Sequence, residues 1–441
     1  MPDLLALHAA SPVRYPFLFE SSAAAGSLGS FDILAAFPGA AITLGHDSVL
    51  HGCQAAGLRA TGFPAALNEA CANGIAADRQ LPFSGGWFVF LAYELAGVIE
   101  ASLRLASEPG LPLAKAVRIP AAVIRERLSG RCLAIAEHGH EHLLEAIGAD
   151  AARAARLPEQ PSAGLLAGAI QEEDPARFLA AVAAAQRHIA AGEIYQANLS
   201  RRWSAEVAAG VEPWMLYASL RRSNPAPFGG IARLDADTAI ISSSPERLVR
   251  VRCGRIETRP IAGTRQRSAA EHEQEAIRRS LLDNAKERAE HIMLIDLERN
   301  DLGRLCQPGS VQVDDFMTVE SHAHVHHIVS GISGRLREDV GPGDMLQAVF
   351  PGGSITGCPK LRCMQLISEL EGCPRGAYTG AMGYLNHDGS CDFNILIRTM
   401  VLQGSRLSFA AGSGIVADSV PALELAETRA KAKGMLLALQ P

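Results

Sequence analysis

The chain has 441 residues, of which 48% are hydrophobic and 20% are charged, and its formal net charge is −6. This composition is typical of a folded globular protein of about two or three domains, and the lack of clustered Lys and Arg excludes the basic surface that binds nucleic acid. The most apolar stretch, Trp87 to Val98, contains Glu94 and is too short to cross a membrane. The N-terminus has no basic leader, and nine unpatterned cysteines favour reduced thiols and a cytoplasmic location. We therefore expect neither nucleic acid nor a membrane as a partner.

The first part of the chain, residues 1–156, alternates short apolar runs with Gly and Ser breaks. Such runs, for example Ser30–Leu44 and Gly85–Gly97, predict strands and turns. The polar, Pro-rich segment 157–164 is the best candidate for a linker. It separates the first part from a second part, residues 165–441.

Helices and strands alternate after this linker. Apolar residues at helical spacing predict helices over 174–191, 280–297 and 421–439. Short β-rich runs predict strands over 194–203, 239–243 and 383–385. The mixture predicts an α+β protein with large, mostly antiparallel sheets and Gly-rich loops gathered over one site.

Two of the predicted helices carry paired acids. Glu287 and Glu290 lie three residues apart, and Glu424 and Glu427 repeat this spacing, so each pair points to one side of its helix. Lys431 follows one turn later. The spacing alone more often marks a solvated helix face. If the two pairs face each other, however, they would hold one hard cation, and Mg²⁺ suits such oxygen ligands better than zinc.

Two Gly-rich segments stand between or beside these helices. Gly352–Lys360 is not a phosphate-binding loop, because two residues separate its last Gly from the Lys. It carries hydroxyls at Ser354 and Thr356 and can still present backbone N–H groups to a carboxylate. Ala411–Ser419 predicts a second such turn, which leads towards the acidic helix.

A histidine-rich segment predicts a strand. His322, His324 and His326 alternate on one face of it, and the lack of a fourth ligand at a suitable spacing disfavours zinc. His327 faces the other way and is a candidate general acid or base, with a structural histidine as the alternative. Cys53 stands in a Gly-Cys-Gln sequence that superficially resembles a glutamine-hydrolysing nucleophile, and we expect it to be structural.

In combination, these segments resemble those of the chorismate-utilising enzymes, which include the large subunits of anthranilate synthase and aminodeoxychorismate synthase and the isochorismate and salicylate synthases. The resemblance runs from Asp174 to the C-terminus through at least eight segments in family order. They are GEIYQANLSRRW, SSSPERLV, TRPIAGTR, AKERAEHIMLIDLERNDLGR, VHHIVS, FPGGSITGCPK, GAMGYLNHDGSCDFNILIRT and AGSGIVADSVPALELAETRAKA. The resemblance implies an α/β/β/α sandwich with the active site in the cleft between its two sheets. Residues 1–156 would form the N-terminal part of this interleaved sandwich, with a candidate tryptophan pocket, and residues 165–441 the chorismate-binding catalytic domain.

The same resemblance assigns roles to residues. Glu290 and Glu427, with Glu424 close by, match the ligands of a Mg²⁺ ion that holds the ring carboxylate of chorismate. Glu246 matches the general acid that protonates the departing 4-hydroxyl, and His327 matches the catalytic histidine beside the same group. Arg398 matches the arginine that binds the enolpyruvyl carboxylate. The substrate-binding positions that the resemblance implies are Arg398, Tyr378, Thr356, Gly412, Ser413, Gly414 and Lys431.

Two positions bear on the reaction. The branches that use water carry a Lys where this chain has Gln196, which favours ammonia as the nucleophile. The segments FPGGSITG, YQANLSRRW and CDFNILIRT resemble the aminodeoxychorismate synthase component I branch, which predicts amination to 4-amino-4-deoxychorismate for folate biosynthesis. Ala262, however, replaces the Lys nucleophile usual in that branch and has the form found in anthranilate synthases. The alternative is therefore ammonia attack at C2 and anthranilate for tryptophan biosynthesis. Both readings imply a separate glutamine amidotransferase subunit.

Overall fold

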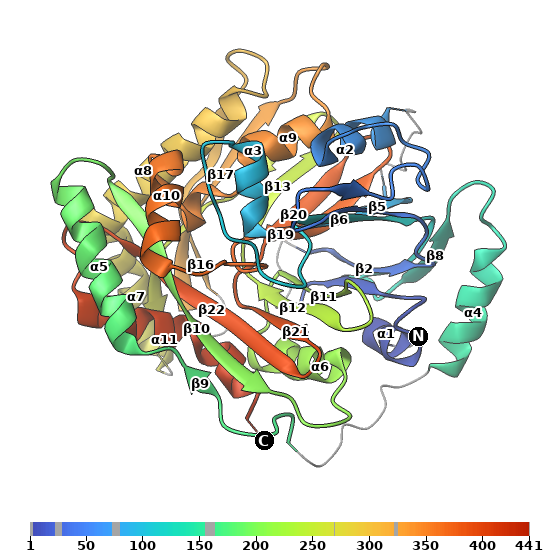
Figure 1. Ribbon diagram of the computed structural model, residues 1–441, viewed down its shortest axis with the longest axis horizontal. Coiled ribbons are helices and arrows are strands. Elements are labelled where there is room, and N and C mark those ends of the chain that lie inside the picture. Colours follow the sequence, from blue (N-terminus) through green and yellow to red (C-terminus); the bar gives the residue numbers. More distant parts are fainter. Residues whose placement is uncertain are drawn as a thin grey trace.

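The computed structural model describes residues 3–22, 29–72, 80–154, 164–268, 270–321 and 325–440. In these residues two large sheets lie against each other, and helices cover their outer faces (Figure 1). Neighbouring strands in both sheets pair antiparallel. The predicted α+β class with two large antiparallel sheets is confirmed. Within the same ranges, no helix is both long and apolar enough to span a bilayer.

The first sheet takes strands from both ends of the chain. In spatial order, its strands are β18 (Gly357–Cys358), β10 (Gln196–Glu206), β22 (Arg406–Ile415), β21 (Thr399–Gln403), β12 (Thr238–Ser244), β11 (Phe228–Arg233), β1 (Phe17–Glu20), β2 (Phe31–Ala36), β7 (Ala121–Glu126) and β8 (Cys132–Ala136), with β9 (Gln171–Glu172) beside β10.

The second sheet is built in the same way. Its strands are, in spatial order, β15 (Ile261–Gln266), β17 (Val325–Arg335), β14 (Arg255–Thr258), β13 (Arg247–Arg252), β20 (Cys391–Ile395), β19 (Ala381–Asn386), β5 (Gly86–Leu91), β6 (Ala114–Ile119), β3 (Ala41–Leu44) and β4 (Leu50–His51), with β16 (Gln312–Ser321) beside β17. Strands before residue 137 therefore occur in both sheets, so the two parts of the chain share one framework. The predicted boundary at 157–164 lies almost wholly outside the described residues, and the division stays a prediction.

Helices form the two outer layers. Those packed on the first sheet are α1 (Leu4–Ala10), α4 (Leu143–Arg153), α5 (Pro175–Ala190), α6 (Pro213–Ser223), α10 (Lys360–Glu371) and α11 (Pro421–Ala438). Those packed on the second sheet are α2 (Phe63–Cys71), α7 (Glu271–Asp283), α8 (Ala285–Gly303) and α9 (Pro342–Val349). Three short turns complete the helices, namely η1 (Tyr93–Leu95), α3 (Ala96–Ile99) and η2 (Gly353–Ile355).

An apolar core fills one end of the space between the sheets. The rings of Phe17 on β1 and Phe88 on β5 stack across it, with centroids 3.7 Å apart and an angle of 3° between their planes. Ile33 and Ile124 of the first sheet and Met382 of the second are buried in the same cluster. Burial of this surface holds the two sheets together, and the positions of side chains elsewhere between the sheets depend on it.

The helix predicted over 280–297 is wrong as a single element. α7 ends at Asp283, and α8 begins at Ala285. Asn284 separates them because its side-chain oxygen accepts a hydrogen bond from the backbone N–H of Glu287 at 3.1 Å, as an N-cap does. Apolar residues at helical spacing predicted this helix, but one of them, Ile292, is 45% exposed. The buried side chains of α8 include two acids and a histidine beside apolar residues; they are His291, Leu294, Ile295, Glu298, Asp301 and Leu302.

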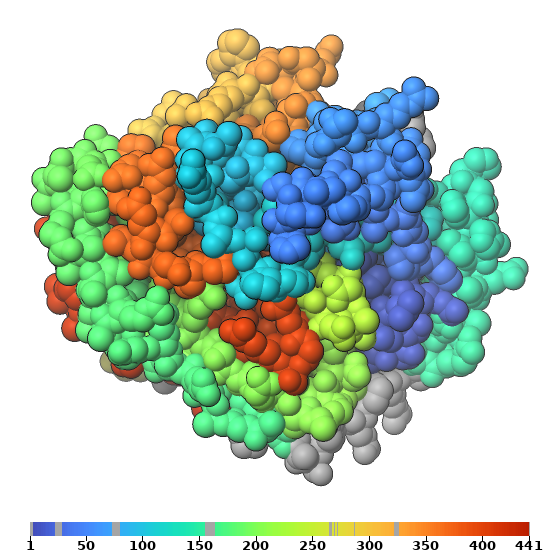
Figure 2. All heavy atoms as spheres, in the orientation of Figure 1, coloured from blue at the N-terminus to red at the C-terminus, as the bar shows by residue number. Residues whose placement is uncertain are grey.

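Two other predicted elements differ from the structure. Ala411 to Ile415 continue β22 and are not a turn, so only residues 416–419 turn towards α11. The apolar run that begins with β5 does not stay extended, because its end forms η1 and α3. Figure 2 shows the segment that contains α3 (cyan) over the middle of this face of the molecule. Buried Glu94 anchors it by accepting hydrogen bonds from the backbone N–H groups of Arg375 at 2.6 Å and Gly376 at 3.1 Å.

Phe88→Ala tests the core between the sheets. We expect it to lower the free energy of unfolding by about 3–5 kcal/mol, because it leaves a cavity opposite Phe17. Urea unfolding followed by circular dichroism measures the change. Phe316→Ala is the control, because Phe316 is 57% exposed on β16; a loss as large as that of Phe88→Ala would contradict the assignment of this core.

Candidate active site

A polar cavity of about 1110 Å³, a volume that includes its opening to solvent, lies beside strands of both sheets and helices α8 and α11. Most residues predicted for the site line this cavity. They are Gln196, Glu246, Ala262, Glu290, His327, Tyr378, Arg398, Gly412, Gly414, Glu424, Glu427 and Lys431. Glu287 and Ser354 line it as well. The fold thus gathers residues from distant segments of the chain around one space.

Glu246 is a buried acid at the turn between β12 and β13. Its side chain is 4% exposed. Its Oε1 accepts a hydrogen bond from the Ser354 hydroxyl at 2.6 Å and a longer one from the Ile261 backbone N–H at 3.4 Å. Burial raises the pKa of Glu246 to about 7. A carboxyl group with this pKa can hold and deliver a proton near neutral pH.

Arg398 and His327 meet in the same cavity. The Arg398 backbone has a φ of 51°, a left-handed conformation that is costly for a residue with a side chain and is often found at functional sites. Its guanidinium donates a hydrogen bond to Nε2 of His327 at 3.1 Å. Because arginine stays protonated, Nε2 of His327 is the acceptor and carries no proton in this arrangement. Burial lowers the pKa of Arg398 to about 10, which shows how far the guanidinium is removed from water.

The two acid pairs converge on this cavity. Glu287 and Glu290 come from α8, and Glu424 and Glu427 come from α11. Burial, followed by the charge of Glu287, raises the pKa of Glu290 to about 7. The Nζ of Lys431 lies 2.7 Å from Glu427 Oε1 and donates a hydrogen bond to the carbonyl oxygen of Gly412 at 3.0 Å. Five Glu side chains in all line the cavity against one Lys and one Arg among the described residues.

This donor set fits a hard divalent cation. Among the residues that the structure describes, no three His, Cys, Asp or Glu side chains are grouped as a complete metal site. Mg²⁺ does not need one, because it is usually bound by one or two carboxylates and keeps water or substrate oxygens as its other ligands. Glu290 and Glu427, with Glu424 nearby, are the residues that would hold it. The raised pKa of Glu290 indicates a site with an excess of negative charge, which a cation would relieve.

Gln196 and the glycines of β22 are packed tightly against each other. The Gln196 amide donates a hydrogen bond to Glu290 Oε1 at 2.7 Å. A Cβ atom at Gly414 would lie 2.4 Å from Gln196 Nε2 and 3.1 Å from Glu290 Oε1. A Cβ atom at Gly412 would lie 2.8 Å from the hydroxyl of Tyr378. These two positions therefore require glycine for the site to form.

Two predicted substrate contacts are not supported by the geometry. Thr356 does not line the cavity, because its hydroxyl is fully buried and donates to the carbonyl oxygen of Gly352 at 3.0 Å. Ser413 is also fully buried and does not line the cavity.

His326 is structural, since its ring forms hydrogen bonds with Ser321 and Gln274, both at 2.7 Å. The remaining histidines of that segment, at 322 and 324, lie outside the described residues.

Arg375 supports the site but was not identified from the sequence. It is buried and forms an ion pair with Glu371 at 2.6 Å. The guanidinium also donates to the carbonyl oxygens of Asn198 at 2.7 Å and Ile355 at 3.1 Å, and it lies 5.6 Å from the ring centre of Tyr378. It thus fixes three segments that surround the cavity. The signal that could have identified it is its place as the single charged residue inside the small-residue segment GCPRGAYTG.

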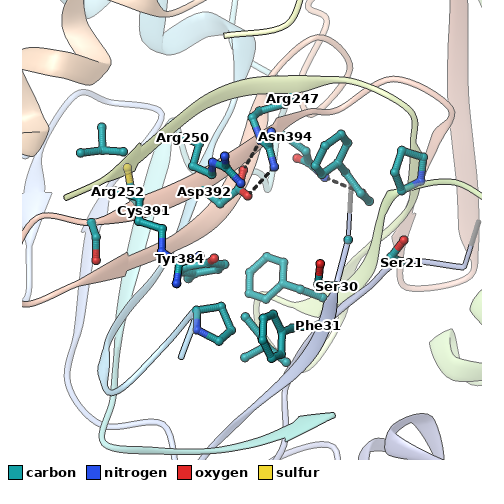
Figure 3. A pocket seen from close by; sticks show the side chains of 18 of the residues that line it. Ser21, Ser30, Phe31, Arg247, Arg250, Arg252, Tyr384, Cys391, Asp392 and Asn394 are labelled. Carbon is teal, nitrogen blue, oxygen red and sulfur yellow. Dashed lines mark hydrogen bonds and ion pairs between the residues drawn. The ribbon is translucent and has the colours of Figure 1, made fainter. Parts of the chain in front are cut away.

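A second cavity of about 1100 Å³, including its open part, is lined by residues between 19 and 82 and by residues between 227 and 394 (Figure 3). Ser21, Ser30 and Phe31 line one side, and Tyr384 and Asp392 belong to the other. In the figure, Asp392 is joined to Arg247, which it binds through two hydrogen bonds of 2.8 and 2.9 Å. The candidate tryptophan pocket was expected within residues 1–156, which line only part of this cavity. That pocket stays a prediction.

The fold and the main cavity define a class of two-sheet α+β proteins with an acid-lined site between the sheets. Residues 21–437 match the chorismate binding enzymes, and the chain belongs to that family. The anthranilate synthase component I-like protein of Synechocystis sp. is 39% identical over 374 residues, which cover 82% of this chain and 74% of that protein. Aminodeoxychorismate synthase component 1 of Bacillus subtilis is 46% identical over 264 residues, which cover 60% of this chain and 55% of that protein. The crystal structure of anthranilate synthase component I from Streptococcus pneumoniae matches with a TM-score of 0.81 and 32% identity over 93% of both chains. The protein is therefore a chorismate-utilising enzyme, similar to relatives that carry two different names.

Glu290→Gln tests the strained acid cluster without an activity assay. The pKa of Glu290 is raised from 4.5 to about 7, so the stability that the protonated group contributes is complete below pH 4.5 and is lost as the pH rises through about 7. The substituted amide cannot ionise, so it avoids this loss, and its oxygen can still accept the hydrogen bond from Gln196. In a chelator, we expect the variant to be more stable than wild type by roughly 2 kcal/mol at about pH 8 and equal to it at about pH 4. Thermal unfolding across this pH range measures the difference.

Asp296→Asn is the control for that experiment, because the Asp296 side chain is 68% exposed on the same helix. Its difference from wild type should stay the same at all pH values. If Glu290→Gln gives no gain at the higher pH, Glu290 is not the strained acid that its surroundings indicate.

Proposed function

We propose that the protein catalyses the Mg²⁺-dependent amination of chorismate by ammonia to 4-amino-4-deoxychorismate, a step towards 4-aminobenzoate and folate. A separate glutamine amidotransferase subunit would supply the ammonia, in the cytoplasm. Membership of the chorismate binding family and the similarity to aminodeoxychorismate synthase component 1 of B. subtilis support this proposal. The observation that carries it is the environment of Gln196 in the cavity.

Gln196 disfavours water as the nucleophile. An amide cannot remove a proton from water, and its Nε2 is already bonded to Glu290. Its Oε1 is buried and has no hydrogen-bond partner among the described residues. Ammonia needs no base before it attacks, and its N–H groups can satisfy such an acceptor. This part of the cavity is therefore better suited to ammonia than to water.

The other lining residues suit the remaining steps. The planar guanidinium of Arg398 can bind the enolpyruvyl carboxylate through two hydrogen bonds. Glu246, whose pKa of about 7 leaves a large share of it protonated at neutral pH, would donate a proton to the 4-hydroxyl, which leaves as water. Ammonia forms the new C–N bond and then loses one proton, which restores the acid, so that chorismate and ammonia give the amino product and water. Mg²⁺ bound by Glu290 and Glu427 would neutralise the ring carboxylate.

Ala262 supports a second candidate function, that of anthranilate synthase component I. Ala262 lines the cavity at the position where the resemblance places a Lys nucleophile, and a methyl group cannot attack C2. The lining residue with an amine, Lys431, is bonded to Glu427 and to the carbonyl oxygen of Gly412. Without a covalent adduct at C2, ammonia could attack this carbon directly. The segments around Gln196 and Arg398 favour the aminodeoxychorismate synthase reaction. Identification of the product distinguishes the two candidate functions.

The proposed function predicts the product of a simple reaction. With chorismate, Mg²⁺ and an ammonium salt, the isolated chain should form 4-amino-4-deoxychorismate, identified by mass spectrometry. Glu290→Gln should lower the rate about 100-fold or more at ordinary Mg²⁺ concentrations, because it weakens the metal site. Direct appearance of anthranilate fluorescence would instead establish the second candidate. Formation of isochorismate would reject ammonia as the preferred nucleophile.

Ala262→Lys tests the control of regiochemistry. A Lys at this position brings an amine into the cavity, and we expect it to increase the share of 4-amino product over anthranilate. Ala262→Met is the matched control, because it adds similar length without an amine. It should lower the total rate and leave the product ratio unchanged. An unchanged ratio in the Lys variant would show that this position does not direct the attack.

A further inference from the structure

A third buried acid on α8 lies next to the main cavity without lining it. Glu298 is two turns after Glu290 on this helix and is 5% exposed. A buried carboxyl group is costly unless its hydrogen bonds are satisfied. The hydrogen-bond partners of the Glu298 carboxylate belong to the two segments that surround Glu246.

Glu298 binds one residue in each of these segments. Its Oε2 accepts a hydrogen bond from the hydroxyl of Thr258 at 3.0 Å, at the end of β14. Its Oε1 accepts one from the backbone N–H of Gly353 at 3.2 Å, at the start of η2. The approach is close, because a Cβ atom at Gly353 would lie 3.2 Å from the Glu298 Oε1 and 2.5 Å from Leu297.

The same two segments hold the acid Glu246. Ser354 directly follows Gly353, and its hydroxyl donates to Glu246 Oε1 at 2.6 Å. Ile261 comes three residues after Thr258, and its backbone N–H donates to the same oxygen at 3.4 Å. Each of these two contacts to the carboxyl group of Glu246 is thus made by a segment that Glu298 anchors from behind.

We propose that Glu298 is a positioning residue for Glu246: its two hydrogen bonds fix the segments that orient the proton donor towards the substrate. The inference rests on the proposed role of Glu246 as the general acid. Glu298 does not touch the substrate. It acts through Thr258 and Gly353, so its loss should impair the chemical step more than the binding of chorismate.

The charges around the two acids also link them. Burial, followed by the charge of Asp301, raises the pKa of Glu298 to about 7, while Lys360, which is bonded to Asp301, lowers it. After burial, the negative charge of Glu298 is a further cause that raises the pKa of Glu246, and Lys431 opposes it. Arg398 also faces Glu246 across the cavity. Because Glu246 must be protonated to act, activity falls as the pH rises through its pKa, and removal of the charge at Glu298 moves this fall to lower pH.

The test compares Glu298→Ala with Glu298→Gln. Glu298→Ala removes both hydrogen bonds and the charge, and it should lower kcat about 10- to 100-fold with a change in KM for chorismate of less than about threefold. Glu298→Gln can accept from Gly353 and donate to the Thr258 hydroxyl, so its kcat should stay within about threefold of wild type. In both variants the alkaline limb of the kcat–pH profile should move to lower pH by about 0.5 to 1 unit.

Thr258→Val gives an independent measurement, because it removes one of the two donors while keeping the shape of the side chain. It should lower kcat less than Glu298→Ala does, and the double variant should be no slower than Glu298→Ala alone. Multiplied effects in the double variant would contradict the inference, because they would mean that the two residues act separately.

Asp301→Asn is the matched control, because Asp301 is the next buried acid on α8 and is bonded to Lys360. It should lower the thermal midpoint, keep kcat within about threefold and not move the alkaline limb to lower pH, because loss of the Asp301 charge favours the ionised form of Glu298. An equal shift of the pH profile in this control would overturn the inference, as would wild-type kcat and pH dependence in Glu298→Ala. The proposed function fails separately, in the wild type, if chorismate is not aminated at all.

Discussion

Burial of several carboxyl groups in one space between two sheets is the constraint on which the site depends. In water each of these acids would be ionised at neutral pH, but inside the sandwich the ionised forms repel one another and lack solvent. Glu246 and Glu290 both respond with a pKa near 7. The two acids are then suited to opposite tasks. Glu246 keeps its proton and can give it away, whereas Glu290, beside three other acids, can exchange its proton for a cation.

The sandwich tolerates this arrangement because the groups that support the acids are rigid. The apolar core around Phe17 and Phe88 fixes the distance between the sheets at one end. At the other end Arg375 and Glu298 hold loops by hydrogen bonds of 2.7 to 3.2 Å from positions behind the cavity. Glycines at 412 and 414 let the wall of β22 approach the side chains opposite. Polar groups that would otherwise relax towards solvent are therefore kept in place.

Much of the fold and of the candidate site could be predicted from the sequence, and the predictions that were wrong have physical causes. The fold class followed from alternating runs and from the ordered family segments, and most of the predicted site residues line one cavity. The helix predicted over 280–297 was wrong in part because the buried side chains of α8 include His291 and Glu298, which a hydrophobic pattern assigns to solvent. The hydroxyl of Thr356 was expected to face the substrate, but its backbone partner is local and cannot be inferred from residue type.

The two parts of the chain share both sheets, which restricts how such a protein can be divided. β1 pairs with β11, and β5 pairs with β19, so strands of the first part extend each sheet at one end of the strands of the second part. Cutting the chain near the predicted linker would leave open hydrogen-bonding edges on β11 and β19 and part of an apolar core on each fragment. Neither half can therefore be inherited, shuffled or fused as an independent module.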